Sequence, residues 1–83
     1  MPNAVYRVTE IVGTSPDSVH QAIRNGVERA AKTLRNLDWF EATEIRGYIA
    51  DGAIQNFQVT MKVGFRLEDG DLDSDAGDPS PWS

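Results

Sequence analysis

Hydrophobic and polar residues alternate along residues 57–67 of the chain. From residue 57 to residue 67 every second position is apolar, and polar residues or glycine lie between them; the apolar positions are Phe57, Val59, Met61, Val63, Phe65 and Leu67. Because successive side chains of a strand point to opposite faces, this pattern predicts a strand with one core face and one polar face. We place this strand at 53–67 and a partner strand at 39–50.

The turn between these strands sets which of their residues face each other. Ile45 and Ile49 should share the core face. A plain two-residue loop would place Ile45 opposite Gln58, a core residue against a polar one. A loop of odd length, with Gly52 in a left-handed conformation and a bulge, removes this conflict. We therefore expect Arg46 to lie opposite Gln58 on the polar face.

A strand and a helix precede this pair. Residues 6–12 are rich in β-branched and aromatic side chains and predict a strand. Ser15 as the N-cap and Pro16 in the first helical position predict a helix start. Apolar residues then recur at three- and four-residue steps, which predicts an amphipathic helix of about 20 residues ending near Asn36. Gly26 lies in its apolar stripe and marks close approach to the sheet.

The element order is thus β-α-β-β, an α+β fold in one domain over residues 1–69 with a three-stranded antiparallel sheet. Residues 70–83 contain four aspartates, two prolines and two glycines, which predicts a disordered acidic tail. One helix covers only one face of the sheet, and the two long strands outreach it. A chain of 83 residues also buries little apolar surface. Both points favour association of several copies.

Composition excludes several kinds of site and partner. The chain has no cysteine, which excludes disulfides, thiolate nucleophiles and cysteine-based metal sites, and its one histidine, His20, excludes a multi-histidine metal site. A net charge of −5 argues against nucleic acid as a partner. No apolar run approaches the roughly 20 residues that span a bilayer, and residues 1–4 do not begin a signal peptide. We therefore expect a cytoplasmic protein without membrane contact.

Residues suited to catalysis are few, so we expect a protein that is not an enzyme. His20 lies early in the expected helix on the side opposite Ile23, which predicts a solvent-exposed residue rather than a general base. No glycine-rich phosphate loop is present. Glu41 and Glu44 are three residues apart in a strand and are expected on opposite faces, which weakens an acid–base pair.

Two residues offer the chemistry of ligand binding. Trp39 stands where the helix gives way to the second strand, and it suits either a core or interface anchor or a stacking surface for a flat aromatic ligand. The amide of Gln58 carries a donor and an acceptor, which suits the edge of a pyrimidine-like ring, although a solvent-exposed glutamine is the simpler interpretation. Arg46, Tyr48 and Arg66 share its face. The arginines are either solvated or contacts for anionic ligand groups.

The chain resembles the dodecins, small bacterial and archaeal flavoproteins. The resemblance covers residues 4–69 nearly without gaps and is clearest in five segments: 11–15, 29–35, 37–41, 46–47 and 57–69. It implies a subunit whose sheet partly wraps its helix, and a hollow homododecamer of such subunits. It also implies that flavins bind in pairs at twofold interfaces, each isoalloxazine ring between a tryptophan and a glutamine.

Transferred to this sequence, the resemblance makes Trp39 the stacking residue and Gln58 the amide that bonds the pyrimidine edge. Arg46 would lie beside the ligand, Arg66 is a further contributor, and Tyr48 occupies a position where many bacterial relatives have histidine. The implied function is storage and sequestration of FMN, riboflavin or FAD, with quenching of the excited flavin. Some members also bind coenzyme A. A structural oligomeric module and a binder of another planar or coenzyme A-like ligand remain alternatives.

Overall fold

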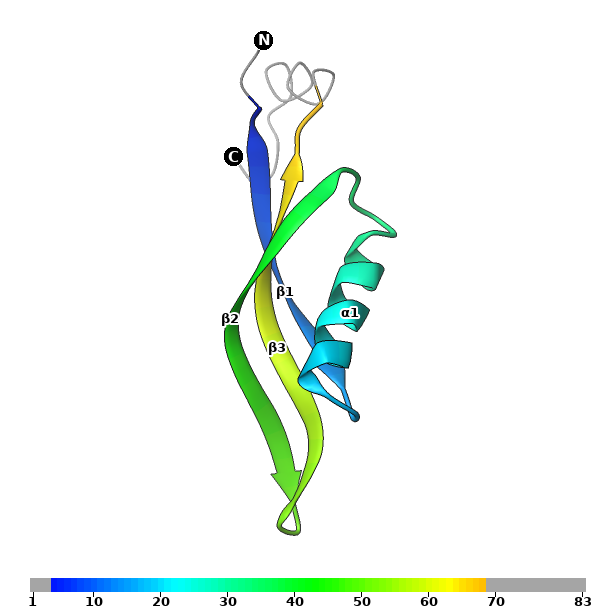
Figure 1. Ribbon diagram of the computed structural model, residues 1–83, viewed down its shortest axis with the longest axis vertical. Helices are drawn as coiled ribbons and strands as arrows, with labels where there is room; N and C mark the ends of the chain where they lie inside the picture. Colours follow the sequence, from blue (N-terminus) through cyan, green and yellow to red (C-terminus); the bar gives the residue numbers. More distant parts are fainter. Residues whose placement is uncertain (1–3, 69–83) are drawn as a thin grey trace.

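A three-stranded antiparallel sheet and one helix make up residues 4–68, the part of the chain that the computed structural model describes (Figure 1). The elements are β1 (Tyr6–Ser15), α1 (Val19–Ala30), β2 (Leu37–Ala50) and β3 (Ala53–Arg66). Their order in the sheet is β1-β3-β2, so β3 is central. The predicted β-α-β-β order and antiparallel sheet are confirmed. The acidic tail predicted at 70–83 lies outside the described residues.

The core lies between α1 and the odd-numbered positions of β3. Val59, Met61 and Val63 are fully buried and form a cluster with Ala22 of the helix. Partly buried apolar side chains pack around this cluster: Ile11, Val19, Ile23, Val27, Leu34 and Leu37. The alternation predicted for β3 is thus confirmed. The even-numbered positions of β3 point to the opposite face of the sheet, which the helix does not cover.

The helix begins later than the sequence predicted. Its N-cap is Ser18, whose Oγ accepts a hydrogen bond from the backbone N–H of Gln21 at 3.0 Å. Ser15, the predicted cap, is instead the last residue of β1, buried, and its Oγ accepts from the backbone N–H of Asp17 at 2.9 Å. Serine forms such local turns readily, and here the turn competes with capping.

The helix is also shorter than predicted. It has 12 residues and ends at Ala30, not near Asn36. The apolar spacing continues beyond its end because Leu34 packs against the core from the connecting turn. Asn36 then adopts a positive φ of 65° and leads the chain into β2. Spacing alone therefore could not distinguish a helix from a turn that packs in the same place.

Two glycines let β1 and α1 approach closely. A Cβ added at Gly26 would lie 2.9 Å from Cε of Met61 and 3.3 Å from Cα of Gly13. A Cβ added at Gly13 would overlap the carbonyl oxygen of Ala22 in the facing helix. The close approach predicted at Gly26 is confirmed, and Gly13 is its counterpart in the sheet.

The turn of the β2–β3 hairpin differs from the predicted one. Asp51 and Gly52 form a two-residue loop between the paired residues Ala50 and Ala53. Both loop residues have positive φ, 54° and 75°. These values are those of a type I′ turn, which matches the right-handed twist of paired strands. The left-handed conformation predicted for Gly52 is confirmed, but the loop of odd length was wrong.

Bulges set the register instead. One lies in β3, where Gln55 is the extra residue, and this bulge gives the predicted pairing of Arg46 with Gln58. Two more lie in β2, where Asp38 and Thr43 are extra. Each extra residue shifts the following side chains by one position relative to the partner strand.

The bulge at Thr43 contradicts one prediction. Glu41 pairs with Lys62 and Glu44 with Thr60. Both partners are even-numbered positions of β3, so the two glutamates lie on the same face rather than on opposite faces. The prediction assumed a regular strand, in which an odd spacing reverses the direction of the side chain.

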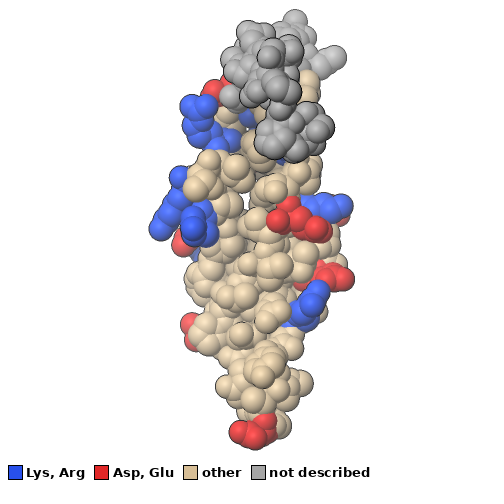
Figure 2. All heavy atoms as spheres, turned by 180° about the vertical axis from the view of Figure 1, so that it is seen from behind, with Lys and Arg blue, Asp and Glu red and all other residues tan. Residues whose placement is uncertain are grey.

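The hairpin extends beyond the end of the helix (Figure 1). Ile45, Ile49 and Ile54 lie on this projecting arm and are 62%, 67% and 59% exposed. Ile45 pairs with the core residue Val59, yet α1 does not reach it. From residue 47 to residue 58 the one charged side chain is that of Asp51, and Figure 2 shows this end of the molecule as largely uncharged apart from its tip. The expectation that the long strands outreach a single helix is confirmed.

Candidate functional site

The five candidate ligand residues lie on the sheet face that the helix leaves uncovered, which we call the open face. Gln58 and Arg66 are even-numbered positions of β3 and belong to it directly. Each candidate on β2 pairs with another such position: Trp39 with Gly64, Arg46 with Gln58, and Tyr48 with Asn56. The sequence thus predicted the shared face of Arg46, Tyr48, Gln58 and Arg66.

Trp39 is placed by a bulge on one side and a glycine on the other. It follows the extra residue Asp38 and lies against Gly64, where a Cβ would overlap Cε2 and Cζ2 of the indole. The residue is 42% exposed. An aromatic ring that rests on a glycine and is half exposed offers a surface on which a second ring can stack.

The cavity found beside Trp39 is small. It measures about 140 Å³ and is lined by Val27, Leu37, Asp38, Trp39, Phe40 and Val63. Pockets for small molecules usually measure roughly 300–1,000 Å³. A planar ligand on this indole therefore needs a second surface to cover it.

Gln58 has an unused amide. Its residue is half-buried, and its side chain has no hydrogen-bond partner within residues 4–68. Two residues earlier on the same face, the buried Oδ1 of Asn56 also has no partner in that part of the chain. Buried polar atoms are normally hydrogen-bonded. Two neighbouring amides with unused donors or acceptors suit a ligand or partner with a mixed polar edge.

The charged and phenolic groups near Gln58 are free to rearrange. Nη2 of Arg46 donates to Oε1 of Glu44 at 2.7 Å, and the two side chains are 61% and 60% exposed. An exposed ion pair contributes at most about 1 kcal/mol, so Arg46 can exchange this carboxylate for a ligand anion. Tyr48 is 61% exposed beside it.

The candidates form two groups within one chain. Gln58, Arg46 and Tyr48 are neighbours at one end of the open face, and Trp39 and Arg66 lie at the other. Gly64, opposite Trp39, is six residues from Gln58 along β3, a separation of about 20 Å in an extended strand. This distance exceeds the length of a tricyclic aromatic ring, so one ring cannot contact both Trp39 and Gln58 of the same chain.

Three residues around Trp39 were not predicted to belong to the site: Tyr6, Asp38 and Gly64. Oη of Tyr6 donates a hydrogen bond to Oδ2 of Asp38 at 2.8 Å. That hydrogen bond, with some desolvation, raises the pKa of Tyr6, and the charge of Arg66 opposes the shift. No sequence signal links Tyr6 and Asp38, which are 32 positions apart. Gly64 did carry a signal, because glycine inside a strand often marks a close approach.

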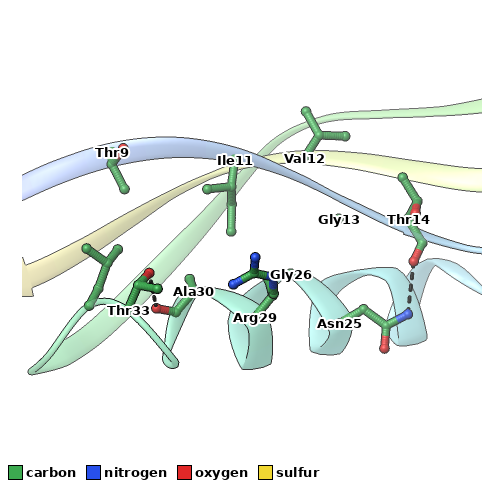
Figure 3. Close-up of a pocket in the computed structure, with 11 residues that line it drawn as sticks. Thr9, Ile11, Val12, Gly13, Thr14, Asn25, Gly26, Arg29, Ala30 and Thr33 are labelled. Atoms are coloured by element: carbon green, nitrogen blue, oxygen red, sulfur yellow. Dashed lines mark hydrogen bonds between the residues drawn. The ribbon is translucent and has the colours of Figure 1, made fainter.

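A separate groove lies on the helix side, between β1 and α1 (Figure 3). It measures about 420 Å³, and none of the five candidate residues lines it. The guanidinium of Arg29 lies between the two elements, and Nδ2 of Asn25 donates to the carbonyl oxygen of Thr14 at 2.9 Å at one end. Within residues 4–68, no cluster of three or more His, Asp or Glu could hold a metal, and no helix is long and apolar enough to cross a bilayer.

Comparison with known proteins covers all the elements described above. The family model "Dodecin" matches residues 5–68. The chain is 51% identical over 65 residues to the dodecin of Thermus thermophilus, which covers 78% of this chain and 94% of the relative. The structure of this chain is similar to that of the dodecin from Streptomyces davaonensis, with a TM-score of 0.79 and 65% identity, and the match covers 82% of this chain and 100% of that one. It is also similar to the structure of the dodecin from Streptomyces coelicolor, with a TM-score of 0.79 and 62% identity over 83% of this chain and 99% of that one.

Proposed function

Because this chain belongs to the dodecin family, we propose that it binds flavins and that it stores and sequesters them without turning them over. The observation that supports this most is the half-exposed indole of Trp39 resting on Gly64. It lies on the same face of the sheet as the amide of Gln58, which has no hydrogen-bond partner within residues 4–68. A flat ring with a polar pyrimidine edge is a ligand that both groups suit.

In this proposal the flavin lies between two copies of the chain. A ring that contacts both an indole and an amide must take them from different copies, because Trp39 and Gln58 are about 20 Å apart in one chain. The exposed isoleucines of the hairpin arm give the copies an apolar surface to bury. We propose the homododecamer of the family as the assembly, with flavins in pairs at its twofold interfaces.

Each candidate residue then has a distinct role. Trp39 stacks on the isoalloxazine ring, and the amide of Gln58 donates to and accepts from its pyrimidine edge. Arg46 exchanges Glu44 for the phosphate of FMN or FAD, which riboflavin lacks. Tyr48 lies beside Arg46 and supplies a hydroxyl, and Arg66 adds positive charge near Trp39.

The stacked indole also supplies the reason for sequestration. Indole is a good electron donor to an excited flavin in van der Waals contact. The electron then returns from the reduced flavin to the oxidised indole, which restores the ground state of both rings before the flavin reacts with other molecules. No step of this function needs an acid–base pair or a nucleophile. Binding of coenzyme A and a cytoplasmic location stay predictions from the sequence.

A titration of FMN fluorescence tests this proposal. The wild-type chain should quench FMN stoichiometrically, and Trp39→Ala should abolish or strongly reduce the quenching. Trp82→Phe is the matched control, because Trp82 is the other tryptophan of the sequence and has no proposed role. If the wild type leaves FMN fluorescence unchanged while light scattering reports an assembled particle, the chain is a structural module or binds another ligand.

A further inference from the structure

The chain that leads into Trp39 is held by several polar contacts. Asn36 has a φ of 65°, and its carbonyl oxygen accepts from the backbone N–H of Arg66 at 3.1 Å. Its Nδ2 donates to the carbonyl oxygen of Arg66 and to Oε2 of Glu68, both at 3.2 Å. These bonds fasten Asn36 to the end of β3, three residues before the indole.

Asp38 lies between this anchor and Trp39, and the sheet itself does not fix it. It is the extra residue of a bulge, so β3 has no register partner for it. The extra residue of a bulge is left out of the hydrogen-bonded ladder. Its orientation is set instead by the hydrogen bond that Oη of Tyr6 donates to its Oδ2 at 2.8 Å.

This hydrogen bond crosses the whole sheet. Tyr6 belongs to β1 and Asp38 to β2, the two edge strands, with β3 between them. Tyr6 pairs with Arg66, two residues from the Gly64 on which the indole rests. The bond and the indole thus share one end of the open face. The bond is exposed to solvent, so it favours one arrangement of Asp38 without locking it, although hydrogen bonds to a carboxylate are stronger than neutral ones.

We propose that the Tyr6–Asp38 hydrogen bond positions the indole of Trp39 for stacking. Tyr6 and Asp38 are positioning residues, and the inference rests on the flavin site proposed above. They act through the bulge, because the residue that follows Asp38 carries the indole. An indole that is already ordered before the ligand arrives loses less side-chain entropy on binding, which raises the affinity.

A purely structural role would look different. If the bond merely fastened β1 to β2, its loss would lower the thermal midpoint and leave the indole as ordered as before. If it positions Trp39, its loss must increase the motion of the indole in the folded, ligand-free protein. The two roles are therefore separated by a measurement on Trp39 itself.

Time-resolved fluorescence anisotropy provides that measurement. In a Trp82→Phe chain Trp39 is the sole tryptophan. We expect Tyr6→Phe and Asp38→Ala each to increase the amplitude of the fast anisotropy decay, and the double variant to add little to either. Thr9→Val is the matched control, since it removes a hydroxyl from the same strand on the helix side of the sheet. Equal decays in Tyr6→Phe, Asp38→Ala and Thr9→Val would overturn the proposal.

The affinity for FMN provides a second readout. Tyr6→Phe should bind FMN about fivefold more weakly than Thr9→Val, at an unchanged particle mass. Wild-type affinity in Tyr6→Phe would contradict a positioning role. If no variant and not even the wild type binds FMN, the proposed function fails, and the anisotropy of the ligand-free protein alone decides whether Tyr6 and Asp38 order the indole.

Discussion

Glycines determine where backbones and rings meet in this molecule. Gly64 lets the indole of Trp39 rest on β3, and Gly13 lets the helix backbone rest on β1. Gly26 faces Gly13 from the helix, but its nearest neighbour is the end of the Met61 side chain. The identities of Trp39 and Gln58 as candidates could be read from the sequence, because indole and amide chemistry belong to single residues. The contact between Tyr6 and Asp38 could not, because it depends on a bulge.

The two facing glycines should differ in their tolerance of a methyl group. Gly13→Ala places Cβ into the carbonyl oxygen of Ala22, so backbones must separate, and we expect the free energy of unfolding to fall by about 3 kcal/mol. Gly26→Ala meets a flexible methionine end and gains helix propensity, so its change should stay within about 1 kcal/mol. Denaturant unfolding of both variants measures the difference. The opposite order of stability would contradict the packing described here.

The helix and strands could be predicted wherever burial imposes a regular apolar spacing. The residues at which they end, and the bulges within them, could not be predicted. The alternation of β3 survives because burial against α1 imposes it on every second residue. The helix was overestimated because Leu34 fills the core from a turn. The faces of Glu41 and Glu44 were mistaken because a bulge at Thr43 leaves no mark in the spacing.

The hairpin arm, with its exposed isoleucines, is the surface that we propose other copies of the chain cover. Ile49 is 67% exposed, so Ile49→Glu should leave the fold of one chain intact but place a charge in the surface that the proposed assembly would bury. We expect a particle mass well below that of the wild type in light scattering. Ile49→Val is the control, because it changes the same exposed side chain without adding a charge. A wild-type mass for Ile49→Glu would remove the arm from the interface.

At the scale of the whole molecule, the proposed site is divided between the two ends of the open face. One chain supplies an indole at one end and, at the other, an amide that has no partner in the described part of the chain; about six residues of β3 separate them. The side-chain chemistry of Trp39 and Gln58 was enough to propose both as ligand residues. The distance between them follows only from the strand register, which the sequence does not show. The proposed flavin site therefore exists in the assembly and not in the subunit.

Mixing two defective chains tests this claim most directly. Trp39→Ala and Gln58→Ala homo-oligomers should each bind FMN weakly. Dissociated and reassembled together, they should regain tight, quenched FMN sites, because an interface between the two variants unites the intact indole of one chain with the intact amide of the other. Reassembly of each variant alone is the control. If the mixture binds no better than the average of its components, Trp39 and Gln58 do not act across an interface, and the divided site is wrong.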